Sequence, residues 1–306
     1  METKIGEQEQ EIEKELCNGV LSLLVPPLPP PPPPPPPSPP TPPPPWIELP
    51  DDVTINILQR LDVVEILESA QRVCTSWWRI CKHPSMWTVI DMEDYWPYNN
   101  SEIACREAVG RSQGQLIDIS IEFFGTPELI CYISERCSQL KRLKLLNWSY
   151  KLTPCLQGAF RKFSALEELY LLCNGNSPED IEFIGTSCCK LKSFARSTPF
   201  KPLFYGQDAK DSYALAVAKS MPNLQNLWLF EDHMTNKGLI AILEGCSRLQ
   251  YLSIWHRFDI DIKGCLGKRS FQKLKAVQCP HGSKNCFKRS CSMLNRRVEA
   301  FRLAPA

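Results

Sequence analysis

One pattern of leucine and other aliphatic residues returns seven times after residue 110, and it constrains the fold more than any other feature of this 306-residue chain. Each copy reads leucine, two residues, an aliphatic residue, one residue and a second aliphatic residue. The leading residues are Leu116, Leu140, Leu166, Leu191, Leu224, Leu249 and Leu274, at intervals of 24, 26, 25, 33, 25 and 25 residues. A fixed period of about 20 to 50 residues is the signature of stacked repeats, so we expect each repeat to bury its apolar side against the next.

A second recurring position supports this array. Three residues before each of the last six leading leucines lies a compact apolar residue, namely Cys137, Phe163, Cys188, Met221, Cys246 or Phe271. The segments in front of these positions are helical in character, for example 127–137, 178–189 and 235–246, the last with a threonine as candidate N-cap. The predicted fold class is therefore α/β: a solenoid with strands on its concave face and helices on its convex face.

The repeat at Leu191 departs from the pattern in two ways. Arg196 stands where the second aliphatic residue is expected. The next interval, of 33 residues, holds an insertion near 199–211. This repeat is therefore expected to be the least regular of the array.

A small helical module precedes the array. Pro50 and Asp51 favour a helix start, because proline needs no hydrogen-bond acceptor there and a carboxylate can accept from the free N–H groups. Apolar residues follow at helical spacing as far as Leu61, and two further short helices are expected over 63–73 and 76–81. Three short helices have a thin core, so we expect this module to gain stability by docking a partner.

The two ends of the chain differ from its middle. Residues 1–45 hold an acidic start and then a run, 26–45, that is proline at all but three positions. Proline lacks the N–H that helices and sheets need, so we expect an extended linker, with docking to a proline-binding groove as the alternative.

From Lys263 to Arg302 there are eleven Lys or Arg and one Glu. We interpret 281–306 as a basic tail, with a nuclear signal or an anionic partner as the alternative.

Residues 46–91 resemble the F-box motif, and residues 92–280 resemble the cysteine-containing subclass of leucine-rich repeats, in which a helix ends in cysteine before the next strand. The residues that carry the first resemblance are Leu49-Pro50-Asp51-Asp52, Ile57-Leu58-Gln59-Arg60-Leu61, Val73-Cys74, Trp77, Pro84 and Trp87. Cys246 before Leu249 illustrates the second. In this order the two modules resemble the F-box/leucine-rich-repeat proteins of plants. The resemblance implies that the F-box binds a Skp-family adaptor of a cullin–RING ubiquitin ligase and that the repeats bind the protein to be ubiquitinated.

The resemblance assigns adaptor binding to seven residues, matched position by position: Leu49, Pro50, Ile57, Leu58, Leu61, Val73 and Trp77. A few large apolar residues dominate most protein interfaces, so these residue types favour a docking surface. The alternative for Ile57, Leu61 and Val73 is that their helical spacing places them in the three-helix core. Leu49 and Pro50 precede the first helix and have less to pack against within the module.

For the target protein, we expect the side chains between the aliphatic positions of each strand to face the concave side. The aromatic ones are Tyr170, Trp228, Phe230, Tyr251 and Trp255. An exposed aromatic patch of this kind would mark a partner surface. The alternative is that the insertion or the C-terminal segment folds over these residues.

The remaining reactive residues give no catalytic motif. We expect the fifteen cysteines to be free thiols, because the chain has ample aliphatic content and an acidic start without a signal-peptide pattern. Cys279, His281, Cys286 and Cys291 could suggest zinc, but they lack paired Cys-x-x-Cys spacing, so we expect no metal and no other cofactor. Cys74 falls at a consensus position and is expected to be a packed thiol, not a nucleophile.

Composition leaves the partner open. A formal net charge of +1 selects neither nucleic acid nor an anionic membrane, and no apolar run is long enough for a membrane span. We therefore expect a non-catalytic receptor subunit of an SCF-type (Skp–cullin–F-box) ubiquitin ligase in the nucleus and cytoplasm. The alternative is a ubiquitin-independent scaffold that uses the repeats and the polyproline run, and an enzymatic function would require product formed by the purified chain alone.

Overall fold

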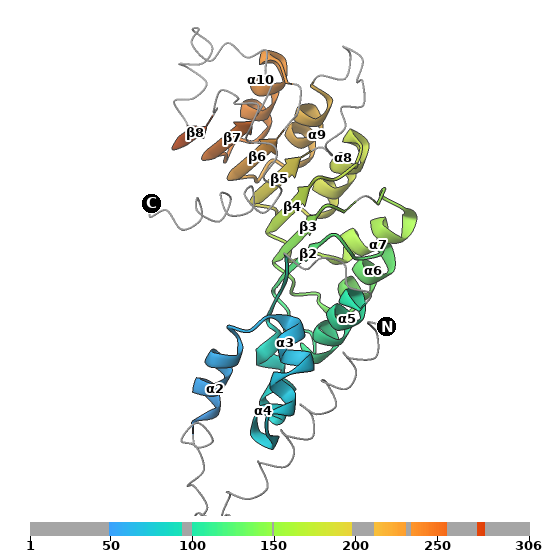
Figure 1. Cartoon of the computed structure of the whole chain (residues 1–306). Helices are drawn as coiled ribbons and strands as arrows, with labels where there is room; N and C mark the ends of the chain where they lie inside the picture. The colour runs from blue at the N-terminus through green and yellow to red at the C-terminus, as the bar shows by residue number, and fades with distance from the viewer. Residues whose placement is uncertain are drawn as a thin grey trace, which may run out of the picture. The chain divides into compact units, whose positions relative to one another are not determined.

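The computed structural model describes residues 49–93, 100–148, 150–197, 211–230, 234–255 and 274–278, and the side chains of Trp255 and residues 276–278 lie outside that description. Along these residues a small helical module is followed by an array of alternating strands and helices (Figure 1). Both predicted parts of the fold are therefore confirmed.

The helical module is built from short helices. Its elements are α2 (Asp51–Leu58), α3 (Val63–Glu68), the 3-10 turn η2 (Ala70–Arg72), α4 (Thr75–Cys81) and the 3-10 turn η3 (Pro84–Trp87). The start of α3 is fixed by a capping box, in which Asp62 accepts a hydrogen bond from the backbone N–H of Glu65 at 2.7 Å and Glu65 accepts one from Asp62. At the start of α4 the Sγ of Cys74 accepts from the backbone N–H of Trp77, which gives this thiol a structural role.

The array is a parallel sheet whose strands follow the order of the sequence. The strands are β1 (Val89–Met92), β2 (Asp118–Glu122), β3 (Arg142–Leu146), β4 (Glu168–Leu172), β5 (Ser193–Ser197), β6 (Asn226–Phe230), β7 (Tyr251–Trp255) and β8 (Ala276–Gln278). The helices between them are α5 (Ser101–Arg111), α6 (Pro127–Arg136), α7 (Pro154–Lys162), α8 (Pro178–Ser187), α9 (Ser212–Ser220) and α10 (Asn236–Gly245). These helices lie on one side of the sheet, and we call the opposite side the strand face (Figure 1).

Three of the array helices begin with the same local sequence. Thr126, Thr153 and Ser177 are N-caps that each precede a proline, and their hydroxyl oxygens accept a hydrogen bond from the backbone N–H three residues later. A proline in the first turn loses no hydrogen bond and has its φ already set for a helix. The Ser/Thr-Pro pairs therefore fix where α6, α7 and α8 begin.

The main apolar core runs continuously from Leu58 in the module to Ile254 in β7. Six leading leucines, from Leu116 to Leu249, are buried in it, and Leu274 is partly buried against it. The described compact residues that end the helices are buried as well. Two of these, Cys188 and Cys246, donate their S–H to backbone carbonyls of the preceding repeat. The recurring cysteine therefore fills a small apolar position and also satisfies a carbonyl oxygen.

The array begins one repeat earlier than the leucine pattern indicates. β1 pairs with β2, and Ile90 lies opposite Ile119. Leu116 lies three residues before Ile119, and Trp87 lies three residues before Ile90. Trp87 therefore occupies the leading-leucine position of an additional repeat. Trp87 is 1% exposed, and its Nε1 donates to the backbone oxygen of Cys81 at 2.9 Å. The last residue of the helical module thus also opens the array.

β5 confirms the irregular repeat at Leu191. Arg196 is in register with Leu171 and Leu229 and is 2% exposed. Its guanidinium carbon lies 3.4 Å from the ring centroid of Tyr213, so a planar cation stacked on an aromatic ring takes the place of the missing aliphatic residue. The predicted insertion falls mainly on 198–210, outside the described residues.

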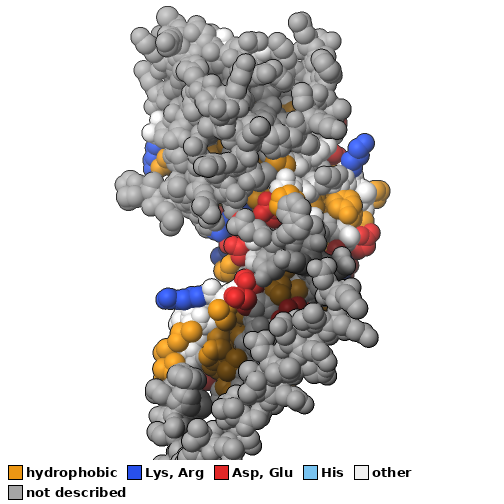
Figure 2. All heavy atoms as spheres, viewed as in Figure 1, with side chains coloured by type: hydrophobic (Ala, Val, Ile, Leu, Met, Phe, Trp, Pro, Cys, Tyr) orange, Lys and Arg blue, Asp and Glu red, His pale blue; other side chains and the backbone are white. Residues whose placement is uncertain are grey.

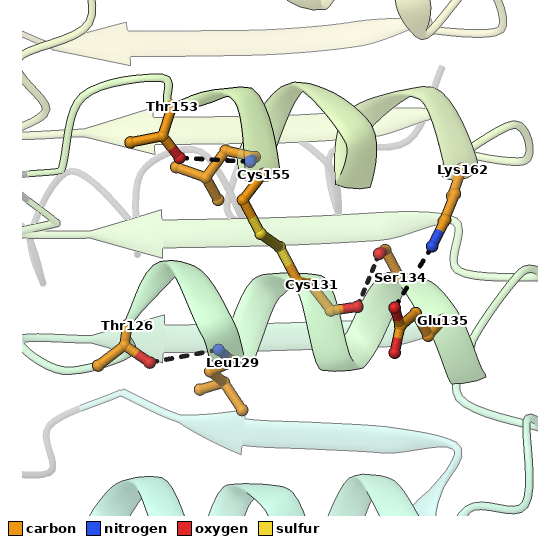
Figure 3. The surroundings of a disulfide bond; sticks show 9 residues. Thr126, Leu129, Cys131, Ser134, Glu135, Thr153, Cys155 and Lys162 are labelled. Carbon is orange, nitrogen blue, oxygen red and sulfur yellow. Dashed lines mark hydrogen bonds and ion pairs between the residues drawn. A yellow bond between two sulfur atoms is a disulfide. The ribbon is translucent and has the colours of Figure 1, made fainter.

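The expectation that every cysteine is a free thiol is wrong for one pair. Cys131 in α6 and Cys155 in α7 form a disulfide bond (Figure 3), whereas the other eight described cysteines are not disulfide-bonded. The two residues are 24 positions apart, but stacking of adjacent helices brings their Cα atoms to 6.8 Å, which a disulfide can span. The contact depends on which helix faces meet, and neither residue belongs to the repeat pattern.

Two other expectations concern membranes and metals. Within the ranges described above, no helix has both the length and the apolar character needed to cross a membrane. The same residues contain no group of three or more His, Cys, Asp or Glu side chains placed to hold a metal ion. The zinc candidates Cys279, His281, Cys286 and Cys291 lie outside the described residues.

Candidate functional site: the exposed apolar surface of the helical module

Large apolar side chains are exposed on the helical module. They are between 36% and 58% exposed, and we call them the module patch: Leu49, Val53, Ile57, Leu61, Val73 and Trp78. Val53 and Ile57 are four residues apart in α2, which places them on the same side of the helix, while Leu49 precedes the helix and Leu61 follows it. Figure 2 shows hydrophobic side chains gathered over this part of the molecule. Exposed apolar surface of this kind is a mark of a docking site.

α2 presents these side chains because its other side and both of its ends are held. Thr54 and Leu58 form the buried side of the helix. At its start, the guanidinium of Arg79 in α4 donates two hydrogen bonds to the Asp51 carboxylate, at 2.6 and 2.8 Å, and lowers the pKa of that carboxyl group. Just past its end, the Nε2 of Gln59 donates to the backbone oxygen of Ser85 at 2.9 Å. The outer side of α2 is left to the solvent.

Most of the residues predicted to bind the adaptor are on the surface. Leu49, Pro50, Ile57, Leu61 and Val73 are all exposed. The alternative that the last three form the three-helix core is therefore wrong. The exposure fits a docking surface, and adaptor binding itself stays a prediction.

Two predicted adaptor residues are placed differently. Leu58 is fully buried and belongs to the core, so its prediction as a surface contact is wrong. Trp77 is only partly exposed and packs against the core. Two exposed residues were missed: Val53, which the helical spacing to Ile57 could have revealed, and Trp78, which the sequence does not distinguish from its neighbour. The Nζ of Lys82 lies 3.9 Å from the Trp78 ring centroid.

The aromatic residues predicted on the strand face do not form an exposed patch. Tyr170, Trp228 and Phe230 are each at most 8% exposed, and they belong to an apolar cluster separate from the main core. Tyr170 and Trp228 flank the small Ala195 in register, so their rings approach to 6.1 Å between centroids. The expectation of an exposed patch is therefore wrong for these three residues. The segments named in the alternative, the insertion and the C-terminal segment, lie almost wholly outside the described residues. Tyr251 is partly buried, and the Trp255 side chain lies outside the described residues.

The strand face carries ion pairs across its first strands. Arg142 in β3 lies in register between Asp118 in β2 and Glu168 in β4 and forms an ion pair with both. The hydroxyl group of Tyr170 donates to Glu168 at 2.8 Å. Burial raises the pKa of Asp118, and Arg142 opposes that shift. Asp118, Arg142 and Glu168 thus form a connected polar network across three strands, in which each charge lies beside an opposite charge.

A second ion pair lies closer to the helical module. The Nζ of Lys144 is 3.3 Å from the Glu93 carboxylate, and burial raises the pKa of Glu93 to about 7. This end of the strand face holds two cations, Arg142 and Lys144, and five carboxyl groups. The carboxyl groups are those of Asp91, Glu93, Asp118, Glu122 and Glu168. Figure 2 shows acidic side chains gathered where the module meets the array. Carboxyl groups thus outnumber cations at this end of the strand face, and Asp91 is the exposed residue among the five.

A hollow of about 520 Å³ adjoins both surfaces. Its lining includes Leu61 of the module patch, Val89 of β1, and the carboxyl groups of Asp91 and Glu93. The module patch is thus continuous with the acidic end of the strand face.

Comparison with known proteins agrees with this geometry. Residues 46–93 match the F-box-like family. The chain is 40% identical over 242 residues to F-box protein SKIP19 of Arabidopsis thaliana, with 78% of each chain covered. It is 41% identical over 246 residues to putative F-box/LRR-repeat protein 23 of the same plant, covering 78% of this chain and 54% of that protein. Putative F-box/LRR-repeat protein 22 is 37% identical over 242 residues, with 77% of each covered. These alignments are far longer than the helical module, so the likeness includes the array.

Proposed function

Because the chain belongs to the F-box/leucine-rich-repeat family of plant proteins, we propose that it is the substrate-recognition subunit of an SCF-type ubiquitin ligase. The module patch binds a Skp-family adaptor, which connects the chain to a cullin–RING ligase. The array binds the protein to be ubiquitinated. The chain contributes proximity, because it holds a lysine of the target near the ubiquitin-conjugating enzyme, and it supplies no catalytic group.

The observation that carries this proposal is the apolar side of α2. Val53 and Ile57 of the helix are exposed, as are Leu49 before it and Leu61 after it, while Leu58 anchors the helix in the core. Leaving large apolar side chains in water costs free energy that burial in an interface would recover, at about 25 cal/mol for each Å² of apolar surface. A helix held in place at both ends also loses little conformational freedom on binding. The patch therefore has the composition and the order of a docking surface.

For the target, we place recognition on the strand face next to the module. The support is chemical: carboxyl groups outnumber cations there, so a target segment with Lys or Arg side chains would be favoured. Tyr170, Trp228 and Phe230 serve in this proposal as the packed floor of the face and not as its exposed contacts. The hollow lined by Leu61, Asp91 and Glu93 supports this proposal, because it adjoins both the module patch and the acidic residues.

Affinity capture of the full chain tests the adaptor contact. The double variant Leu49→Ala, Pro50→Ala should lose co-purification with a Skp-family adaptor while keeping the far-ultraviolet circular dichroism of the wild type. The matched control is Ile103→Ala in α5, because Ile103 is a 65% exposed apolar residue outside the patch. Adaptor recovery should be unchanged in that control.

Two results would count against the proposal. Equal adaptor recovery by the double variant and the wild type would remove the module patch from the interface. A wild-type chain that holds a target protein but captures no Skp-family adaptor would instead support a ubiquitin-independent scaffold.

A further inference from the structure

The two bonded cysteines occupy different positions in their helices. Cys155 is the second residue of α7, directly after Pro154, and its side chain is exposed. Cys131 lies in the middle of α6 and is partly buried against the apolar core. Figure 3 shows the two sulfur atoms meeting between the helices. An ion pair between Lys162 and Glu135, at 3.5 Å, joins the same two helices nearer their other ends.

The surroundings of Cys155 favour its reactive form. The thiolate is the nucleophilic state of cysteine, and the start of a helix stabilises negative charge through its free N–H groups. Buried thiols are the opposite case: burial raises the pKa of Cys105, Cys188 and Cys246 to about 12, so they stay protonated. Cys189 is also exposed, but it follows the end of α8 and does not lie at a helix start.

We propose that Cys155 and Cys131 are a peroxide-oxidised thiol pair, in which Cys155 reacts first and Cys131 completes the disulfide. The Cys155 thiolate attacks one oxygen of hydrogen peroxide, the O–O bond breaks, hydroxide leaves, and a sulfenic acid remains. The Cys131 thiolate then attacks the Cys155 sulfur and displaces hydroxide, which forms the S–S bond. In sum, two thiols lose two electrons and two protons, and the peroxide is reduced to two waters. A small thiol such as glutathione reverses the bond by exchange.

The bond links two consecutive helices of the array. It joins residues 24 positions apart, so it restricts the unfolded chain and stabilises the stacking of two repeats. Both cysteines lie on helices, on the other side of the sheet from the strand face, and outside the module patch. Oxidation should therefore raise the stability of the array without covering either proposed binding surface. This inference does not rest on the ligase function.

The test uses the full chain, reduced and then exposed to hydrogen peroxide at a low ratio to protein. Free thiols are alkylated and the digested protein is analysed by mass spectrometry. We expect the linked Cys131–Cys155 peptide to dominate, and we expect reduction by glutathione to reverse it. The oxidised chain should melt roughly 5 to 10 °C higher than the reduced one. A pair that stays reduced while other cysteines oxidise, or Cys155 joined mainly to a different cysteine, would overturn the proposal.

Single variants separate the two roles. In Cys131→Ser, Cys155 should accumulate sulfenic acid that dimedone traps, and the rise in melting temperature should disappear. In Cys155→Ser, oxidation of Cys131 should be at least about tenfold slower, because it lacks the helix N-terminus. Cys189 is the matched exposed thiol away from a helix N-terminus, and its sequence neighbour Cys188 is buried. Dimedone labelling of Cys155 no faster than that of Cys189 would contradict the assigned order of reaction.

Discussion

The close packing of α9 and α10 makes Gly245→Ala a sharp test of how the repeats stack. A methyl group built at Gly245 would lie 2.3 Å from the backbone oxygen and 2.8 Å from the carbonyl carbon of Ala218. An ordinary carbon–oxygen contact is about 3.3 Å or longer, so the helices would have to separate by about 1 Å. The obstacle is backbone, which cannot rotate away as a flexible side chain can.

The size of the effect follows from two opposing contributions. Forcing an extra carbon into a packed interior costs about 3 kcal/mol when the neighbour is rigid. Alanine recovers about 1 kcal/mol of helix propensity relative to glycine. We therefore expect Gly245→Ala to lower the free energy of unfolding by about 2 kcal/mol and the melting temperature by about 5 °C.

Gly158→Ala is the matched control. Gly158 also lies in an array helix, α7, but a methyl group there would have nothing within 4 Å. This variant should be more stable than the wild type by about 0.5 to 1 kcal/mol. Urea and thermal unfolding followed by far-ultraviolet circular dichroism would compare the three proteins. Equal stability of Gly245→Ala and the wild type, or shifts of the same sign in both variants, would refute the described packing of α9 against α10.

Three further predictions concern single side chains. Burial raises the pKa of Glu93 from 4.5 to about 7, so the folded chain binds the carboxyl proton more tightly than the unfolded chain does. The stability that this bound proton contributes is complete below pH 4.5 and is lost as the pH rises through 7. Glu93→Gln should gain stability relative to the wild type between pH 5 and 8, by up to about 3 kcal/mol, and a pH-independent difference in urea unfolding would contradict this. Leu58→Ala should lower the free energy of unfolding by about 2 to 5 kcal/mol, because Leu58 is buried. Ile57→Ala should lower it by under about 1 kcal/mol and should weaken adaptor capture. Similar unfolding midpoints for the two variants would contradict the burial of Leu58 and the exposure of Ile57. Asp211 accepts hydrogen bonds from the backbone N–H and the hydroxyl of Thr235 at 2.8 and 2.7 Å. Asp211→Ala should therefore destabilise the chain by about 1 to 2 kcal/mol in urea unfolding, and an unchanged midpoint would count against a stabilising role for these hydrogen bonds.

The array could be predicted from the sequence because its period repeats. Each leading leucine marks a strand, and the residue three positions before it marks the end of a helix. β1 escaped this pattern because Trp87, Ile90 and Met92 fill its positions without a leucine, and because Trp87 also belongs to the F-box motif. The irregular repeat at Arg196 was located by the spacing of its neighbours, but its stacking on Tyr213 depends on a contact between distant segments.

The candidate site could be predicted only in outline. Helical spacing indicates that Val53, Ile57 and Leu58 share a short helix, but a helix with apolar residues on several sides does not reveal which side is buried. The approach of the Tyr170 and Trp228 rings depends on contacts between strands, because the Ala195 in register between them is small. The same kind of tertiary contact, between neighbouring helices, brings Cys131 and Cys155 together.

The dissociation constant for a Skp-family adaptor tests the role of the module patch most directly. Isothermal titration calorimetry would compare the full wild-type chain with Ile57→Asp and with Ile103→Asp as the control. We expect micromolar or tighter binding by the wild type and the control, and at least about tenfold weaker binding by Ile57→Asp, because a carboxylate would be buried in an apolar interface. A wild-type chain that shows no binding at micromolar concentrations, or an Ile57→Asp variant that binds as tightly as the wild type, would contradict the proposed role of the patch.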